Sequence, residues 1–450
     1  MIKSINPYTN EIIEKFKQDS KSSVNKKVKL ADKTFQTWSR TNFERKKTLM
    51  LQLAKELKQN KKDYALAITR EMGKPITQAI AEIEKCAWLC EYYANNAESQ
   101  LQSQEIKTDA SKSYVRFDPL GVIFAVMPWN YPFWQVFRFA VPSLMAGNVC
   151  LLKHSSNVMR SAENIQQAFK NAGFPEGCFQ NLIIKSSKVE DVIRNKRVKA
   201  VTLTGSKPAG SSVASIAAEE IKKSVLELGG SNALVVFEDA DIDKTIKACV
   251  QARFQNTGQS CIAGKRLLIH ESIYLKFIES FITEVRELKS GNPEEEDTYI
   301  GVMATEELAK ELEEQLKSSI DKGAKVILGG KRNKAYFEPT VVINVNKKSP
   351  IFEEETFGPV MAVTSFKTDM EALDLVNRSK FGLGVSIFTE DLERAKAMIP
   401  QIEDGAVFIN ELVKSDPRLP FGGTKESGFG RELSSFGIHE FINKKTVYIK

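Results

Sequence analysis

Hydrophobic and polar residues alternate along the chain with two different periods. The first hundred residues are predicted to be helical, and between positions 44 and 75 apolar side chains recur every three or four residues. A Gly-Lys-Pro stop at positions 73–75 ends that stretch. From position 121 onward, short apolar runs alternate with amphipathic stretches. Such alternation predicts parallel strands connected by helices that cover both faces of a sheet.

Two series of strands are expected. The first lies at 121–129, 149–153, 179–184, 199–205 and 233–237, with helices at 158–173 and 208–223. The second follows position 261, with a helix at 271–289 and strands at 265–270, 324–330, 340–345, 360–366, 384–389 and 406–410. The fold class is therefore predicted to be α/β, with two units built on parallel sheets.

Two isolated β segments, 111–121 and 439–450, stand outside these series. Although they are far apart in sequence, they could pair into a small additional sheet. Such a sheet could mediate assembly between copies of the chain.

The length of the chain supports this division. At 450 residues it exceeds the ~250–300 residues at which one hydrophobic core stops growing, so two or three domains are expected. Its 42% hydrophobic and 27% charged residues are typical of a soluble globular protein. No apolar run reaches the ~20 residues that a membrane span needs, and the N-terminus lacks the apolar region of a signal peptide. A cytoplasmic protein without membrane partners is expected.

Charge and cysteine content exclude further classes. The net charge of +7, from 64 basic and 57 acidic residues, is spread along the chain without a basic block interleaved with aromatics, which favours a solvated surface over nucleic-acid binding. Six scattered cysteines in a chain without an export signal do not predict a disulfide framework. The three histidines are far apart, so no metal site is expected.

One of these cysteines has an unusual context. Cys261 lies in the turn-rich segment FQNTGQSCIAGKR, among small and polar residues. It either fills a gap in the core or meets a molecule from solution.

Two other segments suggest chemistry, each with an ordinary alternative. The strand-to-helix turn at Gly205 could present free N–H groups to a phosphate, or Gly205 and Gly210 could serve tight packing. Glu227 ends an apolar run before two glycines. If it is buried, its pKa would rise toward the range of a general base; otherwise it faces solvent at a strand end.

The aromatic segment PWNYPFWQVFRF contains two candidate polar residues. Asn130 lies in a turn, where an asparagine commonly bonds its own backbone. Arg138 is expected on the helix that follows Pro132, where it either forms a structural ion pair or recognises an anion.

Most of the candidate residues above lie in a set of seven short motifs, and the order of these motifs along the chain is that of a known protein family. The chain resembles the aldehyde dehydrogenase superfamily over essentially its full length, and within it the succinate-semialdehyde dehydrogenases of bacteria. The resemblance implies a dinucleotide-binding domain over 1–100 and 120–228, a catalytic domain over 229–431, and an oligomerisation segment over 101–119 and 432–450. The matching motifs are PWNYP, LLKHSSN, TGS, LELGG, GQSC, EEETFGP and PFGGTKESGFGRE.

The resemblance implies three catalytic residues. Cys261 would be the nucleophile that attacks the aldehyde carbon. The Asn130 amide and the Cys261 N–H would hold the oxyanion, a stabilisation on the order of 3–4 kcal/mol for each donor. Glu227 would activate the water that hydrolyses the thioester, so the product would be a carboxylate.

The resemblance also implies a nicotinamide cofactor. Lys153 would bind the adenosine ribose, Glu355 the nicotinamide ribose, and Phe357 would pack on the nicotinamide. Ser156 stands where a glutamate would repel a 2′-phosphate, which favours NADP with NAD also accepted. The implied cofactor-binding set is Trp129, Lys153, Ser156, Gly205, Ser206, Glu355 and Phe357.

For the substrate, the resemblance implies a small aldehyde with a distal carboxylate, anchored by Arg138 and Ser415. Gln255 replaces a second arginine that some relatives carry, which would widen the range toward glutarate semialdehyde. Ala263 excludes a disulfide switch at that position. A homodimer or homotetramer is expected. The alternatives are a general aliphatic aldehyde dehydrogenase and a catalytically silent binding protein of this fold.

Overall fold

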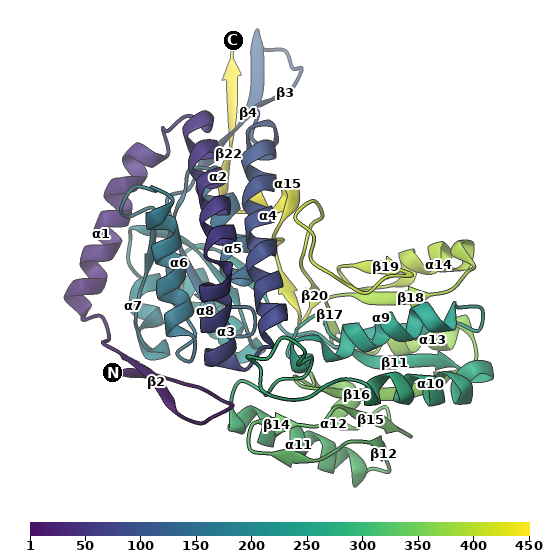
Figure 1. The fold of residues 1–450 in the computed structure, drawn as a ribbon. Helices are drawn as coiled ribbons and strands as arrows, with labels where there is room; N and C mark the ends of the chain where they lie inside the picture. The colour runs from purple at the N-terminus through teal and green to yellow at the C-terminus, as the bar shows by residue number, and fades with distance from the viewer.

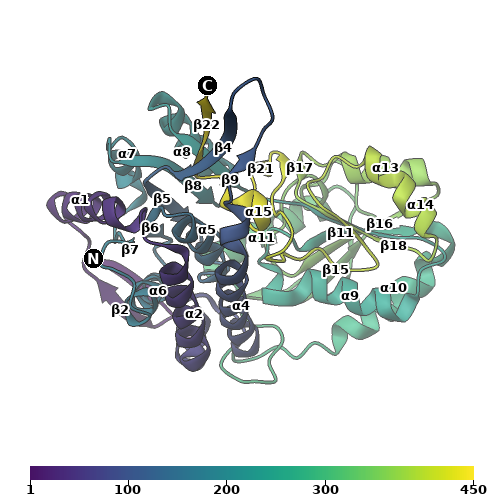
Figure 2. The same ribbon diagram turned by 90° about the horizontal axis from the view of Figure 1, so that it is seen from above.

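The computed structural model describes residues 1–450 and contains two lobes, each built around its own sheet (Figures 1 and 2). The first sheet has six strands in the order β21-β9-β8-β5-β6-β7, and all neighbours are parallel except the edge strand β21. Its central strands are buried on both faces, which is why they are continuously apolar. These strands are β5 (Val122–Met127), β6 (Val149–His154), β7 (Phe179–Asn181), β8 (Val198–Thr204), β9 (Lys223–Glu227) and β21 (Gly428–Phe429).

Helices from the first half of the chain surround this sheet. The long helical pattern between positions 44 and 75 forms two helices, because the chain breaks at Asn60, whose φ of −104° and ψ of 16° are not helical. The helices of this lobe are α1 (Lys21–Trp38), α2 (Phe43–Gln59), α3 (Lys61–Met72), α4 (Ile76–Gln100), α5 (Trp134–Met145), α6 (Met159–Asn171), α7 (Val189–Ile193) and α8 (Lys207–Glu219).

The expectation of helix throughout the first hundred residues is wrong at the N-terminus. There β1 (Ile2–Ile5) and β2 (Ile12–Phe16) form an antiparallel hairpin. The Asn6 side chain accepts the N–H groups of Tyr8 and Thr9 and so closes the turn, which a helix would not allow.

The second sheet has seven strands in the order β12-β15-β16-β11-β10-β18-β19, and only the edge strand β12 is antiparallel. Alternate residues of β10 pack into two separate hydrophobic clusters, one on each face of the sheet. The strands are β10 (Asn232–Val236), β11 (Gly264–His270), β12 (Lys325–Leu328), β15 (Thr340–Ile343), β16 (Val360–Phe366), β18 (Val385–Phe388) and β19 (Val407–Ile409). The helices are α9 (Ile242–Phe254), α10 (Tyr274–Arg286), α11 (Glu306–Ile320), α12 (Pro350–Glu353), α13 (Asp369–Asn377) and α14 (Leu392–Met398).

The two isolated β segments pair with each other, as predicted. β22 (Ile442–Ile449) and β4 (Lys112–Pro119) are antiparallel along their full length, and β3 (Gln104–Glu105) adds a third strand. This sheet projects from the first lobe together with the C-terminus (Figure 1). No helix of the chain is both long and apolar enough to span a bilayer.

Two segments that the expected domain bounds assign to the catalytic domain and the oligomerisation segment pack against the first lobe instead. β21, within the expected catalytic segment, extends the first sheet beside β9. The short helix α15 (Ser434–Ile438) also joins the first lobe, where the Tyr93 hydroxyl donates to the Ser434 carbonyl at 2.9 Å. The domain bounds themselves stay a prediction.

Strand order determines where a ligand can bind. β6 and β7 lie on one side of β5, and β8 and β9 lie on the other. In such sheets the cleft opens at the carboxyl ends of the strands, where the order reverses. The loops after β5 and β8 lie there, and Asn130 in the first of them donates to the Gln259 carbonyl, in the loop before β11. The cleft therefore faces the amino ends of the second sheet.

Candidate active site

The loop that carries Cys261 is held in a strained backbone conformation. Asn256 and Thr257 are buried with φ of 56° and 53°, a region that non-glycine residues rarely adopt. The Asn256 amide donates to the carbonyls of Asn130 and Gln259 at 2.9 and 3.0 Å. Gly258 passes so close to the Gly358 carbonyl that a Cβ would lie 2.5 Å from its oxygen. The loop is thus fixed from both lobes before it reaches Cys261.

Cys261 is the one cysteine with appreciable exposure, because the other five are fully buried. Burial raises the pKa of its thiol to about 11, and the charges of Arg138 and Lys265 partly oppose that rise. At neutral pH the resting side chain is therefore a thiol. Its backbone N–H donates to no group of the chain, so it can serve an incoming ligand.

Asn130 lies after the carboxyl end of β5 and is oriented by two hydrogen bonds. Its Oδ1 accepts from Gln135 Nε2 at 2.9 Å, and its Nδ2 donates to the Gln259 carbonyl at 3.1 Å. An amide nitrogen has two hydrogens, so one donor remains. This donor and the Cys261 N–H are two hydrogen-bond donors available for an oxyanion.

Glu227 ends β9 and is only 2% exposed, so the alternative of a solvent-facing carboxylate is wrong. Neither of its carboxylate oxygens has a hydrogen-bond partner. Burial raises the pKa of Glu227 well above its usual value, the nearby Glu432 raises it further, and Arg138 opposes both. A buried carboxyl group with a raised pKa and free oxygens has the properties of a general base.

In the turn after β8, two glycines pack within the fold and one serine is exposed to solvent. The Gly205 N–H is already donated to the Glu227 carbonyl at 2.9 Å, so it is not free for a phosphate. Ser206 is exposed at the N-cap of α8, and its side chain makes no capping bond. Gly210 packs against Leu228, where a Cβ would lie 2.6 Å from the leucine side chain. The hydroxyl of Ser206 and the positive end of α8 remain available to an anion.

The end of β6 carries a cation without an acidic partner. Lys153 at the end of β6 is 8% exposed, and its nearest polar partner is the Ser186 hydroxyl at 3.4 Å. No carboxylate oxygen lies within 4.0 Å of its ammonium, and burial lowers its pKa. Ser156 is exposed beyond the strand end. A lysine and a serine without a nearby acid fit a phosphate better than a bare ribose.

The opposite wall comes from the second lobe. Glu355 Oε1 accepts from Lys265 Nζ at 2.9 Å and from the Gly230 N–H at 3.0 Å. The Phe357 ring meets the Trp129 ring edge-on, with centroids 5.6 Å apart. Trp129 belongs to the first lobe, so these rings join the two walls of the cleft. Sequence reasoning missed Lys265, which has no motif of its own but holds Glu355.

A cavity of about 150 Å³ lies on the other side of Cys261. This is below the ~300 Å³ at which pockets for drug-sized ligands begin, so it suits a small substrate. Cys261, Arg138, Ser415 and Gln255 all line it. Sequence reasoning missed Lys85, Trp134 and Lys414, which also line it.

Both predicted anchor residues have partners within the chain. The Arg138 side chain is 3% exposed and pairs with Glu432, with Nε and Oε2 2.7 Å apart. Its guanidinium also stacks on the Phe421 ring at 4.4 Å. The ion pair that the sequence left open is therefore present, although Arg138 still faces the cavity. The Ser415 hydroxyl accepts from Lys85 Nζ and Trp134 Nε1, both at 3.0 Å.

The helix that positions these residues is anchored at its start. Glu82 Oε1 accepts the N–H groups of Phe133 and Trp134 at 2.8 and 3.0 Å, which satisfies donors at the beginning of α5. The buried ammonium of Lys74 pairs with the other carboxylate oxygen. Trp134, Gln135 and Arg138 are thereby held in place.

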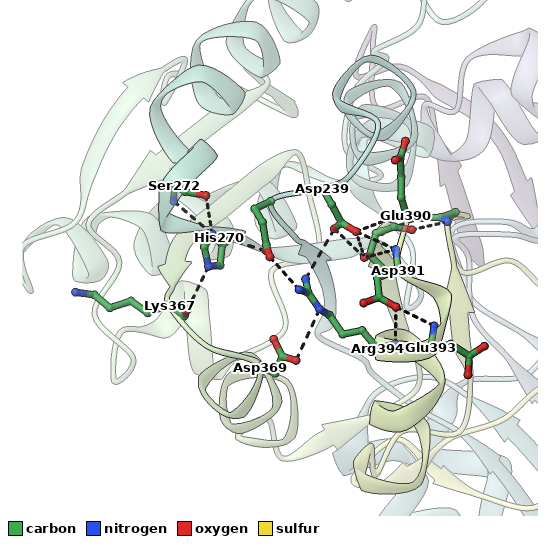
Figure 3. Close-up of polar contacts among 12 residues, drawn as sticks. Asp239, His270, Ser272, Lys367, Asp369, Glu390, Asp391, Glu393 and Arg394 are labelled. Atoms are coloured by element: carbon green, nitrogen blue, oxygen red, sulfur yellow. Dashed lines mark hydrogen bonds and ion pairs between the residues drawn. The ribbon is translucent and has the colours of Figure 1, made fainter.

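A second polar cluster lies at the carboxyl ends of β10, β11 and β18, the opposite end of the second sheet from Cys261 (Figure 3). Arg394 pairs there with Glu238 at 2.9 Å, and Asp239 accepts the N–H groups of Glu390 and Asp391. Burial would raise the pKa of Glu238, but the hydrogen bond from Arg394 lowers it below the usual value. These charges satisfy one another, which indicates a structural network.

The similarity of the chain to known proteins agrees with this geometry. The family model described as "Aldehyde dehydrogenase family" matches residues 1–447. A protein of Synechocystis sp. PCC 6803, named a probable succinate-semialdehyde dehydrogenase with NADP(+) in its name, is 47% identical over all of this chain and 99% of its own. Succinate semialdehyde dehydrogenase Sad of Escherichia coli K12, with NAD(P)+ in its name, is 43% identical over 99% of this chain and 97% of its own.

A solved structure extends the likeness to three dimensions. The succinic semialdehyde dehydrogenase of Streptococcus pyogenes, in complex with NADP+, superposes with a TM-score of 0.97 at 35% identity and covers 100% of both chains. The expected α/β fold with two parallel-sheet units is thereby confirmed. The chain belongs to the aldehyde dehydrogenase family.

Proposed function

We propose that this protein oxidises succinate semialdehyde to succinate with a nicotinamide cofactor, through a thioester on Cys261. The observation that carries the proposal is that three groups lie around the Cys261 loop: Asn130 is bonded to the Gln259 carbonyl of that loop, and the charge of Glu227 acts on the Cys261 thiol. The three groups are an accessible thiol whose own N–H is free, the oriented amide of Asn130, and the buried, unpartnered carboxyl of Glu227. No structural role needs all three.

In the first step the Cys261 thiol gives its proton to solvent water, Sγ bonds to the aldehyde carbon, and the electron pair of the carbonyl π bond moves to the oxygen, which becomes an oxyanion. The Asn130 amide and the Cys261 N–H donate to this oxyanion. Both are fixed beforehand by the strained loop and by Gln135, so little reorganisation is needed when charge develops.

Glu227 acts after the thioester has formed on Cys261. Its carboxylate takes a proton from water as the oxygen of that water bonds to the acyl carbon, and the Cys261 thiolate leaves. The raised pKa of Glu227 makes it a stronger base than an exposed glutamate. The acid product then dissociates.

The cleft residues fit an NADP-type dinucleotide. Lys153 and Ser156 would hold the phosphorylated ribose, Ser206 and the start of α8 the pyrophosphate, and Glu355 the nicotinamide ribose. The unpaired ammonium of Lys153 and the absence of an acid beside it support NADP as the preferred cofactor, with NAD also accepted. When bound, the cofactor accepts the hydride that the substrate carbon loses. The cofactors in the names of the related proteins agree with this preference.

The substrate follows from the cavity and from the names of the relatives. Arg138 and Ser415 would bind the distal carboxylate at the wall of a cavity that admits only a small molecule. We also infer that the sheet of β22, β4 and β3 joins subunits into a homodimer or homotetramer, because it projects from the lobe with exposed Tyr448 and Ile449. The cytoplasmic location stays a prediction from the sequence.

The test is to follow the absorbance of reduced cofactor with succinate semialdehyde and with butanal, each with NADP and NAD. We expect faster turnover of the acid aldehyde and a preference for NADP. Equal kcat/KM for the two aldehydes would contradict the assigned substrate, and a hundredfold preference for NAD would contradict the assigned cofactor. No reduction of either cofactor would favour a silent member of the family.

A further inference from the structure

Lys85 is a positive charge at the cavity wall that has no acidic partner. It lies on α4, is half-buried, and reaches over the Trp134 ring, with Nζ 4.5 Å from the ring centroid. Its only hydrogen bond is the one it donates to the Ser415 hydroxyl at 3.0 Å. No carboxylate oxygen lies within 4.0 Å of its ammonium. Two of its three N–H donors are therefore unused within the chain.

The acids around Lys85 are already occupied. Glu82 is bonded to Lys74 and to the start of α5. Asp416 pairs with Arg418 at 2.7 Å. A partly buried cation without a counter-charge is costly, and an anionic ligand would remove that cost.

The Ser415 hydroxyl completes the arrangement. It accepts hydrogen bonds from both Lys85 and Trp134, which uses its two lone pairs. Its own hydrogen must then point toward another acceptor. Lys85 and Ser415 thus offer an ammonium and a hydroxyl hydrogen side by side at one wall of the cavity that contains Cys261.

We propose that Lys85 is the residue whose free charge binds the distal carboxylate of the aldehyde substrate, with the Ser415 hydroxyl as the neighbouring donor. This inference rests on the proposed function and identifies its specificity-determining residue. Arg138 remains part of this anchor, because its Nη2 has no hydrogen-bond partner, but Glu432 compensates part of its charge. Lys85 supplies the charge that no acid of the chain compensates.

The environment of Lys85 adds a pH dependence. Burial, together with the charge of Arg138, lowers the pKa of Lys85 to about 8. The groups that act on it are Glu82 and Cys86 on α4, Arg138 on α5, and Asp416 in the loop after β19. The ammonium that attracts a carboxylate is present below pH 8 and is lost above it. The preference for the acid aldehyde should therefore weaken as the pH rises past about 8.

The experiment compares kcat/KM for succinate semialdehyde with kcat/KM for butanal in the full-length protein, as a ratio. Lys85→Gln should lower this ratio about 10- to 150-fold, which corresponds to the loss of a hydrogen bond to a charged group. Lys85→Arg should restore part of it. Lys414→Gln is the matched control, because Lys414 lines the same cavity but pairs with Glu411 at 2.6 Å. It should change the ratio less than about twofold, as rim charges do.

A second readout is the ratio as a function of pH. It should fall above about pH 8 in the wild type and stay flat in Lys85→Gln. If Lys85→Gln unfolds, Lys85→Met keeps the aliphatic stem over Trp134 and gives the same comparison. An unchanged ratio, or equal losses with both aldehydes, would overturn the role of Lys85. A wild type that does not prefer the acid aldehyde would instead overturn the proposed substrate, so the two failures are distinguishable.

Discussion

The replacement Glu227→Gln separates the two halves of the proposed reaction. It leaves Cys261, Asn130 and the cleft unchanged but removes the base that activates water. Because a positioned general base contributes about 10²- to 10⁴-fold, steady-state turnover should fall by that factor. Formation of the thioester does not need this base in the proposed mechanism, so one equivalent of reduced cofactor per subunit should still form in a rapid first phase.

The same replacement should stabilise the folded protein at neutral pH. Burial and Glu432 raise the pKa of Glu227 above its unfolded value, so this group costs no stability below the unfolded pKa; the cost grows with pH between the unfolded and the folded pKa and stays constant above the folded pKa. A neutral glutamine of similar size removes this cost, and Tm at pH 8 should rise.

Rapid mixing with NADP and succinate semialdehyde measures the first phase, and mass spectrometry of the quenched protein should find the acyl group on the Cys261 peptide. Glu432→Gln is a control for the loss of a buried carboxylate nearby. Glu432→Gln should accumulate less of the acyl group on Cys261 than Glu227→Gln does. Turnover of Glu227→Gln at the wild-type rate, or loss of the first phase together with turnover, would refute the assigned role.

Three further predictions test other parts of the site. Asn130→Ala should lower kcat about 10²- to 10³-fold, because it removes a hydrogen-bond donor to the oxyanion. An unchanged Tm would show that the variant is folded, and a loss of kcat under threefold would contradict this role of Asn130. Iodoacetamide should label Cys261 alone in the native protein. The labelling rate should rise about tenfold per pH unit up to pH 10, because the pKa of the thiol is about 11. Labelling of another cysteine, detected by peptide mapping, would contradict this prediction. Ser156→Glu should raise KM for NADP at least tenfold and leave KM for NAD within about threefold, because the new carboxylate repels a 2′-phosphate. Equal changes in the two KM values would show that Ser156 is remote from the phosphate.

The sequence predicted the parts of the site that follow strand ends. Asn130, Lys153, Ser206 and Glu227 lie at or just after the carboxyl ends of β5, β6, β8 and β9, as expected from the alternation of apolar runs and helices. A parallel sheet brings such positions to one edge whatever the details of the packing.

Contacts between distant parts of the chain could not be predicted. The partner of Arg138 is 294 positions away, the difference between 432 and 138, and no local pattern identifies it. Lys85 occupies an ordinary position of an amphipathic helix, and only the tertiary structure places it beside Ser415. The N-terminal hairpin was missed for a related reason, because the burial of Ile2 and Phe16 against Met159 depends on the folded lobe.

The most direct test of the central claim compares Cys261→Ala with Cys249→Ala, a matched replacement of a buried cysteine. Each variant is mixed with succinate semialdehyde and NADP, and the absorbance of reduced cofactor is followed. The thioester mechanism predicts no cofactor reduction by Cys261→Ala at any substrate concentration, while Cys249→Ala keeps turning over. Reduction of the cofactor by Cys261→Ala at a rate comparable to the wild type would contradict the account.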